Sequence, residues 1–123
     1  MASNPVVKHR TRAAARQNGR CHYCSCPMWD AMREPVKSFA LRHGISRRLA
    51  RLLQLTAEHL RARQDGGKDR AGNIVAACRV CNLRRHQGTR QPPEPDAYAA
   101  LIQRRVAAGR WHYPPLHRLI AAP

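Results

Sequence analysis

Two pairs of cysteines, each with two residues between its members, are the first feature of this sequence that could do chemistry. This spacing lets one turn of backbone present both sulfur atoms to a single ion, and four thiolates suit a tetrahedral Zn²⁺. Four sulfurs leave no position for a substrate, so the zinc is expected to be structural. The expected ligands are Cys21, Cys24, Cys78 and Cys81, while the fifth cysteine, Cys26, is expected to be a small buried residue.

Polar residues near the second pair suit the hydrolysis of a phosphodiester bond. Glu58 and His59 are adjacent, and Asn82 directly follows Cys81. A neutral histidine can take a proton from water at physiological pH, which makes His59 the predicted general base. Carboxylate and amide oxygens suit a hard divalent ion such as Mg²⁺ or Mn²⁺, so Glu58 and Asn82 are its predicted ligands. Because adjacent strand residues point to opposite faces, these roles require a strand end or bend at residues 58–59.

The order of these features resembles the HNH endonuclease family over about residues 21–88. The resemblance is carried by Glu58-His59, Gly66-Gly67, Asn73-Ile74-Val75 and the second cysteine pair with Asn82. It implies a ββα-metal fold, metal binding by Glu58 and Asn82, proton transfer by His59, and a hydrogen bond from Asn73 that fixes the orientation of His59. It also implies DNA products that carry a 5′-phosphate.

Two positions depart from the common pattern of that family. Glu58 stands where aspartate is commoner, and its extra methylene shifts the place of the metal. Asn82 stands where a third histidine is usual. His86, one helical turn further on, is either another metal ligand or a phosphate-contacting surface residue.

Short elements must position these residues. Residues 53–60 suit a strand, Gly66-Gly67 a turn, Asn73-Ile74-Val75 the returning strand, and residues 82–86 a short helix that ends by Gly88. These elements predict the α+β class, and the resemblance implies a small ββα-metal (His-Me finger) core, braced by the four-cysteine zinc site and flanked by helices. Aromatic residues make up only 5% of the chain, so a metal is expected to supplement a thin core.

Three regions are predicted along the chain. Residues 1–20 form a basic arm, which either tracks phosphates or is solvated, and residues 21–90 form the nuclease domain with a basic helical insertion at about 35–54. Residues 91–123 form a proline-rich linker followed by a helix and a tail. Asp96 is the predicted N-cap and Gly109 the stop signal of that helix, and Trp111, Tyr113 and Leu116 are predicted to pack the tail on the domain.

The charge of the chain predicts a polyanionic partner. Lysine and arginine number 23 against 7 acidic residues, for a formal charge of +16. A biased coding composition explains the preference for arginine over lysine but not the shortage of acids. The expected partner is nucleic acid, most simply double-stranded DNA. The candidate contacts are Arg47, Arg48, Arg51, Arg84 and Arg85.

The chain shows no leader-like segment and no apolar run long enough to span a bilayer, so an intracellular, cytoplasmic protein without a membrane partner is expected. Two functions stay open at this point. One is a metal-dependent endonuclease, and the other is a non-catalytic zinc module that binds DNA or RNA through its arginines. A histidine beside an acidic residue favours the enzyme, since simple binding needs neither.

Overall fold

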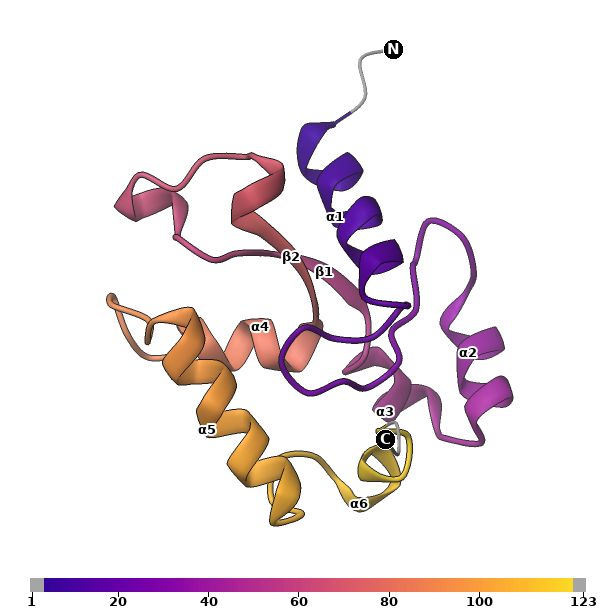
Figure 1. Ribbon diagram of the computed structural model, residues 1–123. Helices are drawn as coiled ribbons and strands as arrows, with labels where there is room; N and C mark the ends of the chain where they lie inside the picture. The colour runs from indigo at the N-terminus through magenta and orange to yellow at the C-terminus, as the bar shows by residue number, and fades with distance from the viewer. Residues whose placement is uncertain (1–3, 121–123) are drawn as a thin grey trace.

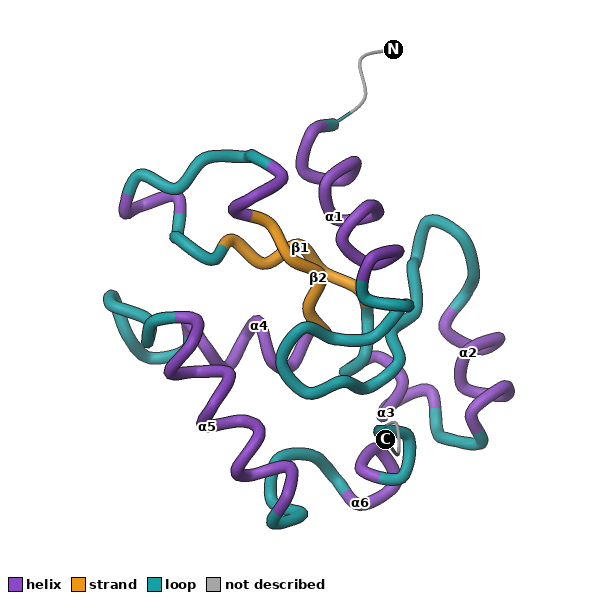
Figure 2. Tube along the Cα trace, in the orientation of Figure 1, coloured by secondary structure: helices purple, strands orange, loops and turns teal. Residues whose placement is uncertain are grey.

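The computed structural model describes residues 4–120. Two short antiparallel strands lie at its centre, with helices around them (Figures 1 and 2). The first half of the chain contains α1 (Pro5–Arg16), α2 (Val36–His43), α3 (Arg47–Arg51) and β1 (Leu55–His59). The second half contains the 3₁₀ turns η1 (Arg63–Asp65) and η2 (Ala71–Asn73), then β2 (Ile74–Cys78), α4 (Arg79–His86), α5 (Pro95–Ala107) and α6 (Pro114–His117).

The strands pair in a register that runs from Leu55 opposite Cys78 to His59 opposite Ile74. Helix α4 follows β2 without a loop, because Cys78 is its N-cap residue. The order β1, β2, α4 is the predicted ββα unit, and the α+β class is confirmed. Helix α4 begins three residues earlier than predicted, which brings Cys81 into its first turn. Asn73 lies in η2 rather than on the returning strand.

Helix α1 covers one face of the two strands. Ala13, fully buried, packs with Leu55 and Ala76, and the Gln17 side chain bonds both the amide and the carbonyl of Ala76. Helix α1, which lies within the predicted basic arm, therefore packs against the sheet through these residues. The small side chains of Ala13 and Ala14 allow the helix to approach the sheet closely. Because no large apolar side chain makes this contact, the sequence did not predict it.

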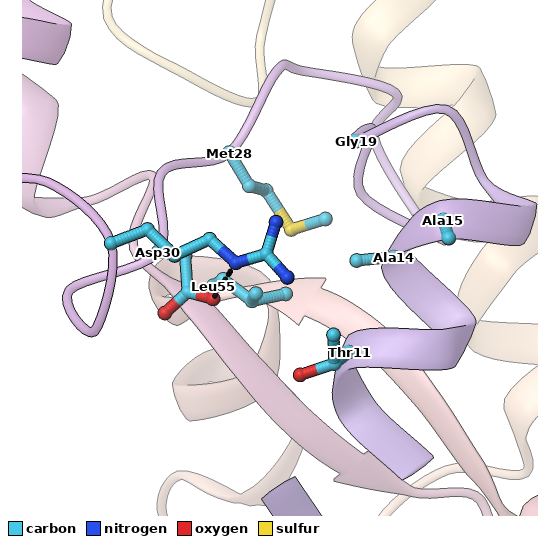
Figure 3. Close-up of a pocket in the computed structure, with 8 residues that line it drawn as sticks. Thr11, Ala14, Ala15, Gly19, Met28, Asp30 and Leu55 are labelled. Carbon is cyan, nitrogen blue, oxygen red and sulfur yellow. Dashed lines mark ion pairs between the residues drawn. The ribbon is translucent and has the colours of Figure 1, made fainter. Parts of the chain in front are cut away.

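Helix α4 covers the opposite face. Thr56 and Glu58 alternate with Leu55 and Ala57 along β1, and their side chains meet Asn82 and His86 of α4. A cavity of about 270 Å³ lies between α1 and the segment that follows the first cysteines (Figure 3). Thr11, Met28 and Leu55 contribute to its lining. No residue that lines this cavity also lines the pocket of Glu58 and His59 described below.

The main core lies where the first cysteine segment, α2, α3 and the C-terminal segment meet. Phe39, Leu53, Ile102 and Leu116 are among its fully buried side chains. Of the tail residues predicted to pack on the domain, Trp111 and Leu116 are buried in this core, whereas Tyr113 is 61% exposed. The helix before the tail begins at Pro95 with Glu94 as N-cap, two positions earlier than Asp96 would have placed it.

Two short helices, α2 and α3, form the region of the predicted basic insertion. Gly44 ends α2 in the left-handed conformation, with φ 65°. The Ser46 side chain then accepts a hydrogen bond from the Leu49 amide and starts α3. Within residues 4–120, no helix combines the length and the apolar character that crossing a membrane would require.

Candidate metal and catalytic sites

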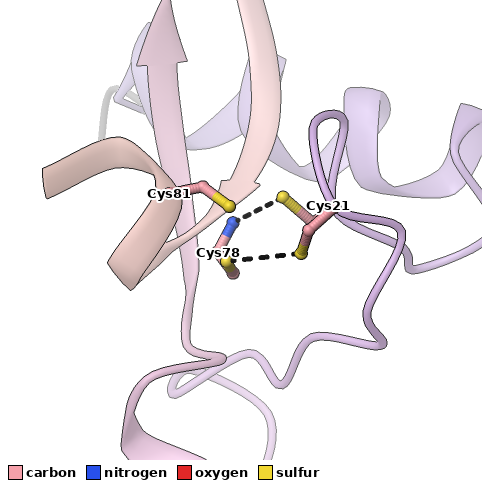
Figure 4. Close-up of side chains that lie close together, drawn as sticks. Cys21, Cys78 and Cys81 are labelled. Atoms are coloured by element: carbon pink, nitrogen blue, oxygen red, sulfur yellow. Dashed lines mark hydrogen bonds between the residues drawn. The ribbon is translucent and has the colours of Figure 1, made fainter. Parts of the chain in front are cut away.

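The two cysteine pairs converge in the interior. The sulfur atoms of Cys21, Cys24, Cys78 and Cys81 lie within 4.8 Å of one another, and all four residues are buried. Cys24 Sγ and Cys78 Sγ are 3.8 Å apart, which matches the spacing of about 3.8 Å between two sulfurs that each lie about 2.3 Å from one tetrahedral ion. Figure 4 shows Cys21 approaching Cys78 and Cys81 from the other side of the site.

Local backbone structure presents each pair of sulfurs. In the first pair, the Ser25 amide bonds the Cys21 carbonyl, and Ser25 has φ 67°. In the second, Cys78 precedes α4 and Cys81 lies in its first turn. N–H groups of Tyr23, Cys78 and Trp111 point at the sulfurs, at 3.4 and 3.2 Å from Cys21 Sγ and 3.2 Å from Cys81 Sγ. Such donors stabilise thiolates.

Burial raises the pKa of the Cys78 and Cys81 thiols well above the usual value. Without a cation, these two sulfurs would therefore stay protonated. A bound Zn²⁺ would supply the positive charge that four buried thiolates need, so the donor set, its spacing and its burial all fit this ion.

A second, more open site lies beside the ββα unit. A pocket of about 310 Å³ is lined by side chains from α1, β1, the following loop and α4. Glu58, His59, Asn82 and His86 all contribute to it. The strand ends at His59, which allows the adjacent Glu58 and His59 to reach the same pocket although they leave the strand in opposite directions.

Glu58 is the most deeply held residue of this pocket, with 1% exposure. Its Oε2 accepts a hydrogen bond from the Tyr23 hydroxyl at 3.2 Å and pairs with Arg85 Nη1 at 3.3 Å. Its Oε1 faces His86 Nε2 at 3.1 Å. Burial raises the pKa of Tyr23, so the phenol stays neutral and donates.

Asn82 and His86 lie one turn apart on α4 and face the same pocket. The Asn82 amide nitrogen donates to Thr56 Oγ1 and to the Ala57 carbonyl, both at 3.1 Å. This anchors the amide and leaves Oδ1 without a donor among the described residues. The 3.1 Å between His86 Nε2 and Glu58 Oε1 equals, within about 0.1 Å, the separation of neighbouring ligands around an octahedral ion with bonds of about 2.1 Å.

His59 contacts an acidic residue that sequence reasoning missed. Its Nε2 lies 2.7 Å from Asp69 Oδ1. The hydrogen bond with His59, followed by the nearby Arg63 guanidinium, lowers the pKa of Asp69, so Asp69 is a carboxylate at neutral pH. A carboxylate can only accept, so Nε2 carries the proton and Nδ1 is the basic nitrogen.

Asn73 organises the loop instead of touching the His59 side chain. Its Oδ1 accepts from the Arg61 amide at 2.8 Å, and its Nδ2 donates to the carbonyls of Arg61 and Lys68 at 3.0 and 2.9 Å. Gly67 closes the same loop, because a Cβ there would collide with the Arg61 carbonyl. Asn73 and Gly67 thus hold the loop in the shape that returns Asp69 to His59. In the sequence, the Gly66-Gly67 turn was the one feature that indicated a tight loop between His59 and Asp69.

The five candidate DNA-contacting arginines fall into two groups. Arg47, Arg48 and Arg51 of α3 are exposed. Arg85 is only 3% exposed and donates to the carbonyls of His59, Leu60 and Pro93 as well as pairing with Glu58, so it has no free donor face for a phosphate. Arg84 is exposed, but its guanidinium lies 4.8 Å from the Trp111 ring centre and bonds the Trp111 carbonyl.

The order of β1, β2 and α4, with a pocket lined by Glu58 and His59 of β1 and by Asn82 and His86 of α4 beside four converging cysteines, is that of a ββα-metal core. Residues 41–88 match the model of the family described as HNH endonuclease, and the resemblance seen in the sequence is confirmed for this segment. The first cysteine pair precedes the matched residues. No curated protein and no solved structure matched the chain. The family match supports a nuclease or another activity on nucleic acid.

Proposed function

We propose that this protein is a metal-dependent endonuclease that hydrolyses phosphodiester bonds in DNA. The observation that carries the proposal is the shared pocket of Glu58, His59, Asn82 and His86. A buried carboxylate, an amide oxygen and an imidazole nitrogen are donors that suit a hard or borderline divalent ion. A histidine oriented by a carboxylate is suited to proton transfer.

Each residue has a defined part in this proposal. Glu58, Asn82 and His86 would hold Mg²⁺, Mn²⁺ or a similar ion. When bound, that ion would orient the scissile phosphate and stabilise the charge on the departing 3′ oxygen. His59 Nδ1 accepts a proton from the attacking water while Asp69 holds the ring and favours the imidazolium that forms. Asn73 keeps the loop that carries Asp69 in place.

The four-cysteine cluster has a structural part. A Zn²⁺ held there would tie the segment before α2 to the start of α4, and so would fix the helix that carries Asn82 and His86 relative to β1. The exposed arginines of α3 are proposed to contact double-stranded DNA through its phosphates, and base readout is not assigned to any residue.

The test is plasmid cleavage by the purified protein with Mg²⁺ or Mn²⁺, with EDTA as the control. His59→Ala is expected to lower the cleavage rate by about 10²–10⁴-fold without changing the circular dichroism spectrum or DNA affinity. The matched control is His43→Ala, which removes a half-buried histidine outside the pocket. Unchanged cleavage by His59→Ala would eliminate the assigned base. DNA binding by the wild type without any metal-dependent cleavage would instead support the non-catalytic zinc module.

A further inference from the structure

Cys26 lies next to the four-cysteine cluster without belonging to it. It follows Cys24 by two residues, in the same turn, and is fully buried. Its carbonyl accepts from the Cys21 amide at 2.9 Å, and its thiol makes a weak hydrogen bond to the Leu116 carbonyl at 3.5 Å. The Cys26 thiol is therefore buried with only weak hydrogen bonding, and sulfur is a preferred ligand of thiophilic ions.

His112 faces the same region with an unpartnered ring nitrogen. The residue is 8% exposed, and its Nε2 has no hydrogen-bond partner within residues 4–120. Its neighbour His117 differs, because His117 Nε2 accepts from the amides of Trp111 and His112 at 3.3 and 2.9 Å. Buried polar groups nearly always have a partner, so the bare nitrogen of His112 calls for one.

Cys24, Cys26 and His112 come together. Each offers a ligand atom, and the three atoms lie within 4.8 Å of one another, all in buried residues. Ligand atoms at about 2.0–2.3 Å from one tetrahedral ion are about 3.4–3.8 Å apart, so side-chain movements of about 1 Å would close the trio on an ion. Two thiolates and an imidazole select Zn²⁺ over Mg²⁺ or Ca²⁺.

We propose that Cys24, Cys26 and His112 form a second zinc site, in which the Cys24 thiolate bridges to the ion held by the four-cysteine cluster. This inference rests on the zinc proposed for that cluster. On binding, Cys26 loses its thiol proton to solvent as its sulfur bonds the metal, and no oxidation or reduction takes place. His112 binds as the neutral imidazole through a ring nitrogen.

The charges and the chain topology support this site. One Zn²⁺ with four thiolates carries a net charge of about −2, whereas two Zn²⁺ with five thiolates carry about −1. Arg20, which donates to the Ser25 carbonyl between the two cysteines, lies close enough to offset that remainder. The second ion also fastens the C-terminal segment around His112 to the first cysteine turn, since no disulfide does so among the described residues.

Metal stoichiometry and ¹¹³Cd NMR test the proposal on the full chain. Wild-type protein is expected to hold two zinc ions, or two cadmium ions after exchange. The two ¹¹³Cd resonances should both lie in the thiolate range and should split each other through the shared Cys24 sulfur. Cys26→Ser and His112→Gln should each reduce the count from two ions to one, while the control His117→Gln should retain two.

Each other outcome counts against the site in a distinct way. One ion in the wild type would overturn the second site and leave the four-cysteine site standing, and no ion would overturn both. Two ions without coupling, or with one resonance in the oxygen-ligand range, would place the second metal in the pocket of Glu58 instead. If Cys26→Ser fails to fold, the count in His112→Gln decides, and two retained ions there would refute the assignment.

Discussion

Glu58 takes part in two features, the pocket that we propose binds a metal and a buried ion pair with Arg85. Its side chain lines the pocket, and its carboxylate also neutralises the charge of the Arg85 guanidinium, which is only 3% exposed. Removing one partner of a buried pair leaves an uncompensated charge in the interior. A loss of activity on changing Glu58 is therefore ambiguous unless stability is measured as well.

We expect Glu58→Gln to lower the free energy of unfolding by about 3–5 kcal/mol, because the Arg85 guanidinium would lose its counter-charge. Urea denaturation measures this difference. The double variant Glu58→Gln/Arg85→Met should regain part of the loss. The matched control is Glu34→Gln, which breaks the exposed pair with Arg42 and should change stability by at most about 1 kcal/mol. Equal effects of the two single changes would contradict the buried-pair argument.

Asp69 gives a cleaner test of catalysis, since it lies on an exposed loop. Asp69→Asn should keep the His59 contact but remove the charge that favours the imidazolium, and so should lower the cleavage rate by about 10–100-fold. Asp65→Asn removes the same charge from the same loop away from His59 and should leave the rate unchanged. Single-turnover cleavage rates for both variants check this, and matching rates would refute a positioning part for Asp69.

For single residues, the sequence allowed candidate site residues to be chosen but not the contacts that they make. Glu58, His59 and Asn82 could be selected because their types fit the chemistry and their order fits a known family. The partners of those residues could not be selected. Arg85 was grouped with the surface arginines because nothing in a basic helix distinguishes the one guanidinium that turns inward. Asp69 lies ten positions from His59, and only the folded loop joins them.

Among the elements, the packing of α1 on the sheet was the least predictable from the sequence. The residue pattern predicted the two strands and the short helix, the cysteine spacing predicted a zinc site, and the resemblance to the HNH family implied the ββα unit. The sequence of α1 has no apolar pattern that predicts its contact with the sheet. That contact is made by Ala13 and Ala14 and by the polar side chain of Gln17. Small residues allow close approach but are equally common on exposed helices. The division of the chain into an arm, a domain and a tail stays a prediction.

We expect Ala13→Glu to destabilise the protein by at least about 2 kcal/mol, because it would force a carboxylate between α1 and the strands. Ala15→Glu adds the same charge on an exposed position of the same helix and should change stability by no more than about 0.5 kcal/mol. Thermal or urea unfolding of the two variants separates them. Similar stabilities would mean that α1 is not held on the sheet in solution.

For the whole molecule, the +16 charge predicts strong but salt-sensitive affinity for DNA. If α3 lies on the DNA, replacing Arg47, Arg48 and Arg51 by Gln should reduce the slope of log affinity against log salt by about 2–3. The matched control replaces Arg104, Arg110 and Arg118, which are also exposed but lie elsewhere. Fluorescence anisotropy at several salt concentrations measures both slopes, and equal decreases would show diffuse attraction rather than a located interface.

The cysteine cluster joins residues 21–24 to residues 78–81, so with a metal in place the 53 residues between Cys24 and Cys78 form a closed ring. A single proteolytic cut in that ring, for example at the exposed Gly44 between α2 and α3, would then give two polypeptide fragments that stay associated. The bound metal and the packing of Ala13 against Leu55 and Ala76 would both hold the two fragments together. A protein nicked there would thus still keep α1 packed on β1 and β2.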